Sequence, residues 1–333
     1  MPGIQEIAAR AGVSPATVSR ALRGLAHVNP KTREKIFEAA AEIGYPTAAI
    51  ENLMDSGHKS RAVGVITQDI EGWYSSHAIS GIEQALREAD MDLVLYNFNQ
   101  NQGRERIFQA ERLNGLDALI IISLPPTEAE FQQIVALDIP IVLIGIHRDD
   151  VTSITINDYE GAKLATEHLV ELGHTKIALM SDEPEALFGF TAPRDRTRAF
   201  HDVLSAHGIT FNESHEVHGG FSLKTAVKAM DDLLSQPDRP TAIFCLSDEM
   251  AFGAMSSIRN HGLRVPEDIS VVGFDDHAMS EFAGLTTVAQ PIELLAQMAA
   301  LTIMGKINKP NNEVKVLNFP IQLVIRNSTH KIN

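Results

Sequence analysis

The chain has 333 residues, of which 44% are hydrophobic, so it exceeds one typical domain and can bury large cores. Its single cysteine, Cys245, excludes a disulfide framework within the chain and suggests a reducing compartment. No apolar segment of the signal-peptide type begins the sequence, and no run approaches the roughly 18 to 20 apolar residues of a membrane span. We therefore expect a cytoplasmic protein without a membrane partner.

The formal net charge of −15 argues against a nucleic-acid partner, because phosphate binding depends on Lys and Arg. The charge is unevenly distributed, however. Residues 1–62 contain eight Lys or Arg and six Asp or Glu, a net charge of +2, so the rest of the chain carries −17. An acidic body disfavours non-specific DNA binding and leaves a mildly basic N-terminal segment free to bind.

Residues 4–22 have the pattern of two short helices. Ile7 and Ala11 fall at helical spacing, and Gly12 can end this first helix in a left-handed conformation. Ser14 can cap a second helix, and Pro15 suits its first position. Two short helices joined by a tight turn are typical of a helix-turn-helix, whose second helix enters the DNA major groove. A helical hairpin that only packs is the alternative.

A third helix is predicted after Asn29, which can cap it, with Pro30 at its first position. Ile36 and Ile43 belong to its apolar stripe, and Gly44 ends the pattern. Three short helices followed by a linker and a large body favour a DNA-binding headpiece over a hairpin that only packs.

The segments AGVSPATVSRAL, VNPKTREKI and GYP resemble the headpiece of the LacI/GalR family of bacterial transcription regulators, and the likeness extends through the chain. The resemblance implies a helix-turn-helix DNA-binding domain at residues 1–46, a hinge at 47–61 and an effector-binding and dimerisation core at 62–333. Within the core it implies an N-subdomain of about 62–157 and 291–318 and a C-subdomain of about 158–290 and 319–333.

The resemblance also implies which headpiece residues contact DNA. Pro15, Ala16 and Arg20 take base-reading positions, which fits their chemistry, because Arg can pair with guanine and Ala can touch a thymine methyl. Hydroxyl groups near them can bond phosphates. The expected headpiece contacts are Ser14, Pro15, Ala16, Thr17, Ser19, Arg20 and Asn29.

Residues 45–61 form the linker, which in this family becomes a hinge helix whose leucine wedges into the minor groove of the operator. The resemblance puts Met54 at the wedge position with Leu53 beside it, and an apolar side chain of either kind can unstack a base step. Glu51 and Asp55 add negative charge, and Asn52 stands where a basic residue is common, so this hinge departs from the family pattern. An ordinary flexible linker is the alternative.

From residue 62 onward, short β-branched apolar runs alternate with amphipathic helices. Two rounds of this pattern predict two doubly wound subdomains with parallel sheets covered on both faces. The expected strands are 62–67, 92–98, 117–122, 139–146, 153–156, 176–181, 215–218, 242–246 and 269–274. The expected helices are 75–89, 103–114, 127–137, 158–172, 194–207, 222–235 and 248–261.

Ligands of open α/β sheets bind in the crevice at the carboxyl ends of the strands, so side chains that follow each strand are candidates. These are Asp69, Trp73 and Tyr74 after the first strand, Arg148 after the fourth, Asp248 after FCL and Asp275 after VVGF. An acid at a strand end can instead cap the next helix, and Trp73 and Tyr74 can instead pack between the subdomains.

The resemblance implies a core like a type I periplasmic sugar-binding protein, with an effector in this crevice. Asp275 of the GFDD motif then accepts hydrogens from hydroxyl or amine groups, and Arg196 lies at the mouth of the second subdomain. Asn157 and Asp158 reverse the family's Asp-Asn pair, which leaves the contact there open. The expected effector-binding residues are Asp69, Trp73, Tyr74, Arg148, Asn157, Arg196, Phe221, Asp248, Asp275 and Gln290.

The sequence contains no G-x-S-x-G elbow, no P-loop and no complete G-x-G-x-x-G. Asp275 to His277 and the pair His215 and His218 lack a third ligand at a recognised spacing. We therefore expect no enzyme, no cofactor and no metal.

A helix-turn-helix reads only a few base pairs, so the sequence predicts a homodimeric repressor on a palindromic operator, modulated by a small, sugar-like effector. Whether the effector is an inducer or a corepressor stays open. A regulator controlled by a partner protein is one alternative, and a binding protein without DNA function is less favoured because of the headpiece. The resemblance puts helices 75–89 and 248–261 in the dimer surface, and the ending RNSTHKIN lacks the leucine heptads of a tetramer.

Overall fold

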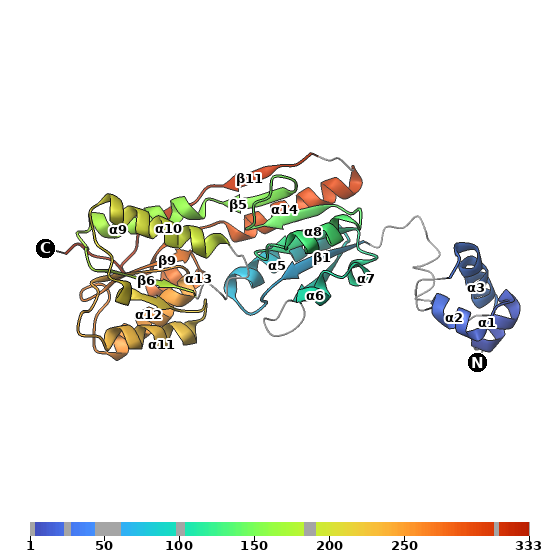
Figure 1. Ribbon diagram of the computed structural model, residues 1–333, viewed down its shortest axis with the longest axis horizontal. Coiled ribbons are helices and arrows are strands. Elements are labelled where there is room, and N and C mark those ends of the chain that lie inside the picture. The colour runs from blue at the N-terminus through green and yellow to red at the C-terminus, as the bar shows by residue number, and fades with distance from the viewer. Residues whose placement is uncertain are drawn as a thin grey trace. The chain divides into compact units, whose positions relative to one another are not determined.

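The computed structural model describes residues 4–22, 28–43, 61–97, 104–182, 191–309 and 313–332. Its contacts divide the chain into two compact units, Met1–Arg61 and Ala62–Asn333, here called unit 1 and unit 2. Figure 1 labels the helices and strands of both units.

Unit 1 contains three helices, α1 (Ile4–Ala11), α2 (Pro15–Leu22) and α3 (Pro30–Glu42). Gly12, at φ +66°, lies between α1 and α2 in the left-handed conformation that glycine adopts without strain. Ser14 caps α2, because its Oγ accepts a hydrogen bond from the Thr17 backbone N–H at 3.1 Å. Asn29 caps α3 through its Oδ1, 2.9 Å from the Lys31 nitrogen.

The three helices of unit 1 enclose one small core. α1 contributes Ile7, α2 contributes Val18, and α3 contributes Ile36 and Phe37, and all four side chains are buried. These residues recur at helical spacing, so burying one stripe of each helix leaves the opposite stripe of α2 exposed.

The first sheet of unit 2 has the strand order β11-β5-β4-β3-β1-β2, and all its pairs are parallel. Its strands are β1 (Ala62–Thr67), β2 (Asp92–Asn97), β3 (Ala118–Ile122), β4 (Ile141–Ile144), β5 (Thr152–Ile156) and β11 (Val316–Phe319). Its helices are α5 (Trp73–Glu88), α6 (Arg104–Ile107), α7 (Ala110–Leu113), α8 (Glu128–Val135) and α14 (Ile292–Asn308).

Alternate residues of these strands enter two different cores, as the two-residue period of a strand requires. Val63 and Val65 of β1 pack with α5 and α14, whereas Ile66 packs on the opposite face with α7 and α8. Because both faces of β1, β3 and β4 are covered, these strands are largely apolar, which is why they were predictable as continuous runs.

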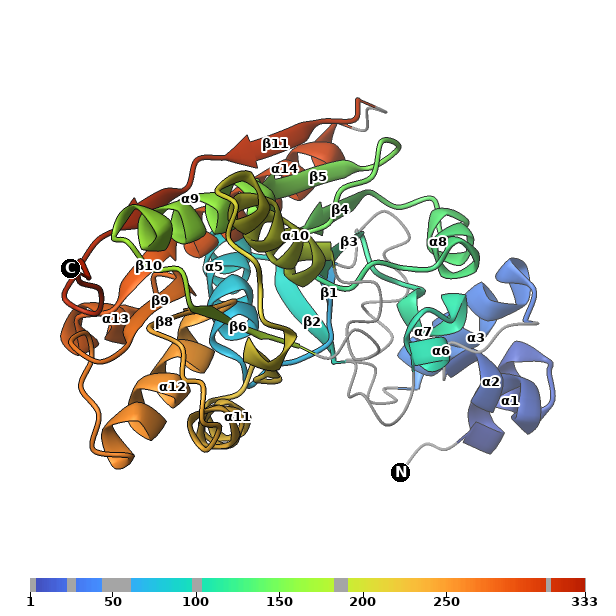
Figure 2. The same cartoon turned by 60° about the vertical axis from the view of Figure 1, so that its left-hand side comes forward.

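The second sheet has the order β12-β10-β9-β8-β6-β7, in which only the pair β10 and β12 is antiparallel. Its strands are β6 (Ile177–Ser181), β7 (Glu216–His218), β8 (Ala242–Cys245), β9 (Ser270–Asp275), β10 (Thr286–Ala289) and β12 (Gln322–Val324). Its helices are α9 (Asp158–Glu171), α10 (Thr191–Ala206), α11 (Leu223–Leu234), α12 (Asp248–Asn260) and α13 (Ala278–Ala283). Figure 2 shows α9 beside α10 and α11 near α12, and each of these pairs packs together.

The chain passes between the sheets three times, after β5, after β10 and after β11. Each sheet therefore contains strands from both ends of unit 2. None of the helices in the described ranges is long and apolar enough to cross a membrane.

The predicted elements differ from the structure mainly at one place. The helix expected at 103–114 is two short helices, α6 and α7, because Phe108 and Gln109 interrupt it and Phe108 turns into the core. The other predicted strands and helices of unit 2 have the bounds given above to within a few residues.

Candidate functional site

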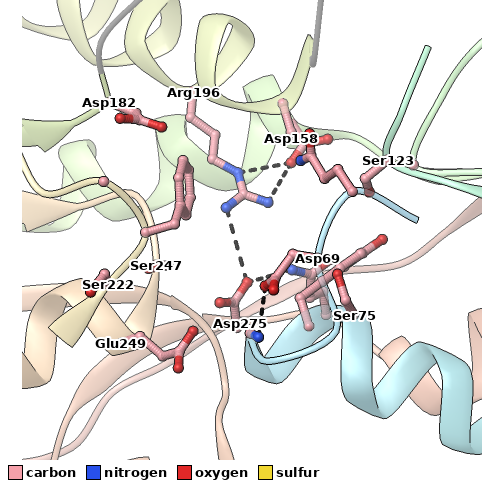
Figure 3. A pocket seen from close by; sticks show the side chains of 18 of the residues that line it. Asp69, Ser75, Ser123, Asp158, Asp182, Arg196, Ser222, Ser247, Glu249 and Asp275 are labelled. Atoms are coloured by element: carbon pink, nitrogen blue, oxygen red, sulfur yellow. Dashed lines mark hydrogen bonds and ion pairs between the residues drawn. The ribbon is translucent and has the colours of Figure 1, made fainter. Parts of the chain in front are cut away.

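Unit 2 contains a cavity of about 510 Å³ lined by residues from both sheets. Its lining includes side chains just beyond the carboxyl ends of strands, such as Asp69 after β1, Ser123 after β3 and Ser247 after β8. This is the edge where open α/β sheets bind ligands, and the volume is typical of small-molecule sites. Figure 3 shows the cavity from close by.

Arg196, from α10, is the one basic side chain among the described residues that line the cavity. Its Nε and Nη2 atoms lie 2.8 and 2.7 Å from Asp158 Oδ1, and its Nη1 donates to the Leu246 carbonyl at 2.6 Å. The guanidinium carbon lies 3.5 Å from the centre of the Phe274 ring, and Nη1 lies 4.0 Å from Asp275 Oδ1 (Figure 3). These partners are what makes burial of a cation tolerable.

Asp275 ends β9 and is 7% exposed. Its Oδ1 accepts a hydrogen bond from Gln290 Nε2 at 2.5 Å. Burial raises the pKa of Asp275 well above its usual value, the Arg196 guanidinium lowers it in part, and the Asp248 carboxylate raises it again. A ligand that contacts Asp275 can therefore change its charge state.

Two hydroxyl groups lie on the wall formed by the first sheet. Burial raises the pKa of Tyr74 to about 12, so its phenol stays protonated at neutral pH and can donate a hydrogen bond. Ser123 is 4% exposed, and within the described part of the chain its hydroxyl has no close polar partner besides the Tyr74 phenol, whose pKa it lowers in part. A Cβ at Gly145 would lie 2.8 Å from Ser123 Oγ and 3.2 Å from Tyr74 Oη, so only glycine leaves room for both hydroxyls.

Six of the ten predicted effector-binding residues line the cavity, and they come from both sheets. They are Asp69, Tyr74, Arg196, Phe221, Asp275 and Gln290. Three lining residues other than glycine, Ser123, Phe221 and Asp275, have positive φ angles of 49°, 45° and 130°. Strained backbone of this kind tends to gather at ligand sites.

Two other predicted residues, Arg148 and Asn157, lie outside the lining. The Arg148 guanidinium forms two 2.8 Å hydrogen bonds with Asp150 and lies 3.7 Å from the centre of the Phe131 ring. Asn157 caps α9, because its Oδ1 accepts from the Glu160 nitrogen at 3.0 Å. Both side chains hold local structure beside the cavity.

The remaining two, Trp73 and Asp248, are also absent from the lining. The Trp73 ring packs against His277 with 4.8 Å between ring centres. Asp248 is fully buried and accepts from the His277 backbone at 2.8 Å and from the hydroxyls of Ser280 and Thr287 at 2.6 Å each. Burial raises its pKa to about 6 despite these donors. Asp248 thus ties α12 to the loop after β9.

Sequence reasoning missed several polar residues of the cavity. They are Gln68, Glu71, Ser75, Ser123, Thr155, Asp158, Asp182, Ser222 and Glu249. Three of them, Gln68, Ser123 and Asp182, directly follow a strand, which is the signal that identified Asp69 and Asp275. A position at the end of a strand does not by itself show which of two neighbouring residues faces the cavity.

In unit 1, the exposed side of α2 and the turn before it contain most of the predicted DNA contacts. Ser14, Pro15, Ala16 and Arg20 are exposed, and Thr17 is half-buried. Val18, between them, is buried in the core. This exposure pattern leaves small, polar and basic side chains free on one side of the helix.

Of the other predicted DNA contacts, the structure describes the side chain of Asn29 but not those of Ser19, Leu53 and Met54. Asn29 is exposed at the start of α3, where it acts as the cap. Ser19 lies within α2, and its side chain is outside what the structure describes. Leu53 and Met54 lie outside the described residues.

Comparisons with known proteins agree on one family. Residues 3–47 match the family described as bacterial regulatory proteins, lacI family, and residues 166–329 match the periplasmic binding protein-like domain. The chain is 31% identical to the probable HTH-type transcriptional repressor ExuR of Bacillus subtilis, over 100% of this chain and 99% of the relative. It is also 31% identical to the HTH-type transcriptional repressor PurR of Vibrio vulnificus, over the full length of both.

A solved structure of the lac repressor dimer, bound to operator and the anti-inducer ONPF, is similar with a TM-score of 0.73 and 27% identity. The alignment covers 99% of each chain. The predicted fold, a helix-turn-helix domain followed by two parallel-sheet subdomains, is confirmed. The resemblance inferred from the sequence is confirmed as well: the chain belongs to the LacI family of bacterial transcriptional regulators.

Proposed function

We propose that the chain is a cytoplasmic repressor that binds a two-fold symmetric operator as a homodimer and changes its operator affinity when a small molecule occupies the cavity. Residues 1–46 read DNA, 47–61 form the hinge and 62–333 bind the effector and the second subunit. The observation that carries the proposal is the exposed side of α2, which presents Arg20 opposite a buried Val18.

The DNA-reading role follows from the chemistry of that side. Arg20 can donate two hydrogen bonds to one guanine, and Ala16 is small enough to touch a thymine methyl. Ser14 and Thr17 already share a 2.8 Å hydrogen bond between their hydroxyls, which holds the turn in front of the helix. Leu53 and Met54 remain the proposed minor-groove wedge of the hinge.

The effector role follows from the cavity, whose lining joins both sheets. We assign effector contacts to Asp69, Tyr74, Arg196, Phe221, Asp275 and Gln290. The lac repressor structure, with its operator and anti-inducer, is a precedent for DNA and a small molecule bound by one such chain. A ligand that touches both walls favours one relative placement of the two sheets, which is the kind of two-state element that allostery needs.

The homodimer is supported by apolar side chains that unit 2 leaves exposed. Phe282 of α13 is 82% exposed and Met279 is 53% exposed. Beside them, Phe252 and Met255 of α12 line a shallow hollow. Exposed apolar clusters of this kind mark association surfaces.

The test is a selection of genomic DNA fragments by the purified full chain at physiological salt. We expect the retained fragments to share a palindromic sequence bound about a thousandfold or more tightly than random DNA. Arg20→Ala should weaken binding to that sequence by about 1 to 3 kcal/mol, with much less effect on random DNA.

Arg10→Ala is the matched control, because Arg10 lies in α1 and pairs with Glu42 at 3.1 Å. It should leave the preference for the palindrome intact. Retention of fragments with no common sequence, or equal losses by both variants, would contradict the proposal.

A further inference from the structure

The walls of the cavity are strongly acidic. Among the described lining residues there are six carboxylates and one basic side chain, Arg196. The carboxylates are Asp69, Glu71, Asp158, Asp182, Glu249 and Asp275. An anionic ligand would therefore meet an excess of like charge.

The guanidinium of Arg196 already has partners within the protein. Arg196 forms its shortest contacts with Asp158, at 2.7 and 2.8 Å, and a further hydrogen bond with the Leu246 carbonyl. Its nearest approach to Asp275 is 4.0 Å. Because Asp158 is its closest partner, Arg196 compensates the charge of Asp275 only in part, and no ion pair joins it to Asp69 or Glu249 among the described residues.

Two of those carboxylates, Asp69 and Glu249, lie close together. Asp69 and Glu249 approach Gly72 together, since a Cβ on Gly72 would lie 2.4 Å from Asp69 Oδ2 and 4.0 Å from Glu249 Oε2. Neither forms an ion pair with a basic side chain in the described ranges; Asp69 accepts backbone N–H groups, and Glu249 accepts the Trp73 N–H at 3.4 Å.

The electrostatics of Glu249 agree with that arrangement. Burial raises the pKa of Glu249, and the Asp69 carboxylate raises it further. A nearby cation stabilises the charged form of a carboxylate whose pKa is raised in this way.

A metal ion is not the cation that this arrangement fits. The described residues contain no group of three or more His, Cys, Asp or Glu placed to hold one ion. The carboxylates instead surround a cavity of about 510 Å³, which has room for an organic molecule.

Unused hydroxyl groups line the same cavity. The Ser123 hydroxyl is buried and borders the cavity, and in the described part of the chain it has no close polar partner besides the Tyr74 phenol. A buried polar group of this kind is satisfied when a ligand supplies the missing hydrogen bond. Tyr74 and Ser247 add further hydroxyls to the lining. Together they favour a ligand that itself carries hydroxyl groups.

We propose that the effector is a polyhydroxylated molecule with a protonated amine, held at the amine by Asp69 and Glu249 and at a hydroxyl by Ser123. The proposal rests on the assignment of this cavity as the effector site. Charge-assisted hydrogen bonds from an ammonium group to carboxylates are among the stronger polar contacts in proteins.

The test uses triplets of six-carbon compounds that share one carbon skeleton and carry an amine, no charged group or a carboxylate. The probes are glucosamine, glucose and glucuronate; galactosamine, galactose and galacturonate; and glucamine, glucitol and gluconate. Binding to the full chain is measured by thermal shift at millimolar concentration and then by calorimetry. The measurements are made at about pH 6.5, where the amines are charged. We expect binding by at least one amine, at least about tenfold more tightly than its neutral counterpart.

Glu249→Gln keeps the shape of the side chain and removes its charge. It should lower the ratio of amine to neutral affinity about tenfold or more. Glu267→Gln is the control, because it changes net charge equally at an exposed position outside the lining and should leave the ratio unchanged.

Tighter binding of a neutral or carboxylate member, or no shift with any amine, would overturn the proposal. A neutral member that binds and alters operator affinity would leave the regulatory function standing while removing this inference. An amine that binds the cavity more tightly than its neutral counterpart but does not alter operator affinity would support the ligand chemistry and contradict the regulatory function.

Discussion

The Arg196 side chain connects several of the elements that surround the cavity. It belongs to α10, yet its partners are Asp158 at the start of α9, the Leu246 carbonyl after β8 and the Phe274 ring of β9. The guanidinium therefore joins three neighbouring strand-helix junctions around the cavity. Breaking such a buried pair leaves an uncompensated charge, which costs more than the pair itself contributes.

We predict that Arg196→Met lowers the free energy of unfolding by about 3 to 5 kcal/mol at neutral pH, because Asp158 stays buried without its cation. Urea unfolding of the full chain measures this. Arg198→Met is the control on the same helix, since the Arg198 side chain is 61% exposed, and its effect should stay within about 0.5 kcal/mol. Adding Asp158→Asn to Arg196→Met should recover part of the loss. A loss no larger than that of the control would contradict this account of Arg196.

The same junctions explain which site residues the sequence could reveal. It located the junction after β8 but favoured Asp248, whereas Ser247 and Glu249 line the cavity and Asp248 turns inward. Successive residues in the first turn of a helix point about 100° apart, so a choice between neighbours needs the helix orientation. Asn157 and Asp158 differ in the same way: the first caps α9, and the second faces the cavity.

At the scale of elements, the C-terminal segment is fastened to the second sheet by a buried histidine. His174 follows α9 and is fully buried. Its Nδ1 lies 2.9 Å from the Thr241 hydroxyl, and its Nε2 lies 3.0 Å from the Ser270 hydroxyl and 3.2 Å from the His330 carbonyl. Burial lowers the pKa of His174 from 6.5 to about 4.

This depressed pKa makes stability depend on pH. Between pH 6.5 and about 4 the unfolded chain binds a proton at His174 that the folded chain does not, so acidification favours unfolding. The stability from neutral His174 is complete above pH 6.5 and is lost as the pH falls through that range. One proton accounts for at most about 1.4 kcal/mol per pH unit.

We predict that His174→Gln flattens this part of the profile of unfolding free energy against pH, measured by denaturant titration at several pH values. His207→Gln is the control, because His207 is exposed directly after α10 and its ring is hydrogen-bonded to the Val203 carbonyl, one turn away. If both variants keep the wild-type slope, His174 is not the group that makes the unfolding free energy depend on pH in this range.

Elements differed in how well the sequence predicted them. Strands β1, β3 and β4 of the first sheet were predictable because both of their faces are covered and their runs are largely apolar, whereas the partly exposed strand β11 was not predicted. The segment that forms α14 was placed with the first subdomain but not identified as a helix. Its exposed side also contains Leu294 and Leu301, at 45% and 54% exposure, so its helical period is weak in the sequence.

At the scale of the whole molecule, the two units divide the chemistry of regulation. The first 62 residues carry a net charge of +2 and the rest −17, so the electrostatic field favours contact with DNA through unit 1 alone. The cavity lies in unit 2, lined by both sheets. Regulation then requires a free-energy coupling between ligand binding and operator binding, and that coupling is reciprocal.

Three chain crossings between the sheets give unit 2 the means to respond to a ligand. The segments after β5, β10 and β11 each connect one sheet to the other. A ligand held by Asp69 beyond the first sheet and by Asp275 in the second stabilises one arrangement of these connections over another. A ligand with equal affinity for both arrangements would shift neither.

The most direct test of this account measures the affinity of the full chain for its selected palindrome with and without each compound that binds the cavity. We predict that such a compound changes operator affinity about fivefold or more, and that the palindrome changes the compound's affinity by the same factor. Asp275→Ala should remove both effects while leaving operator affinity without the compound near that of the wild type. A compound that binds this cavity and leaves operator affinity unchanged would contradict the account.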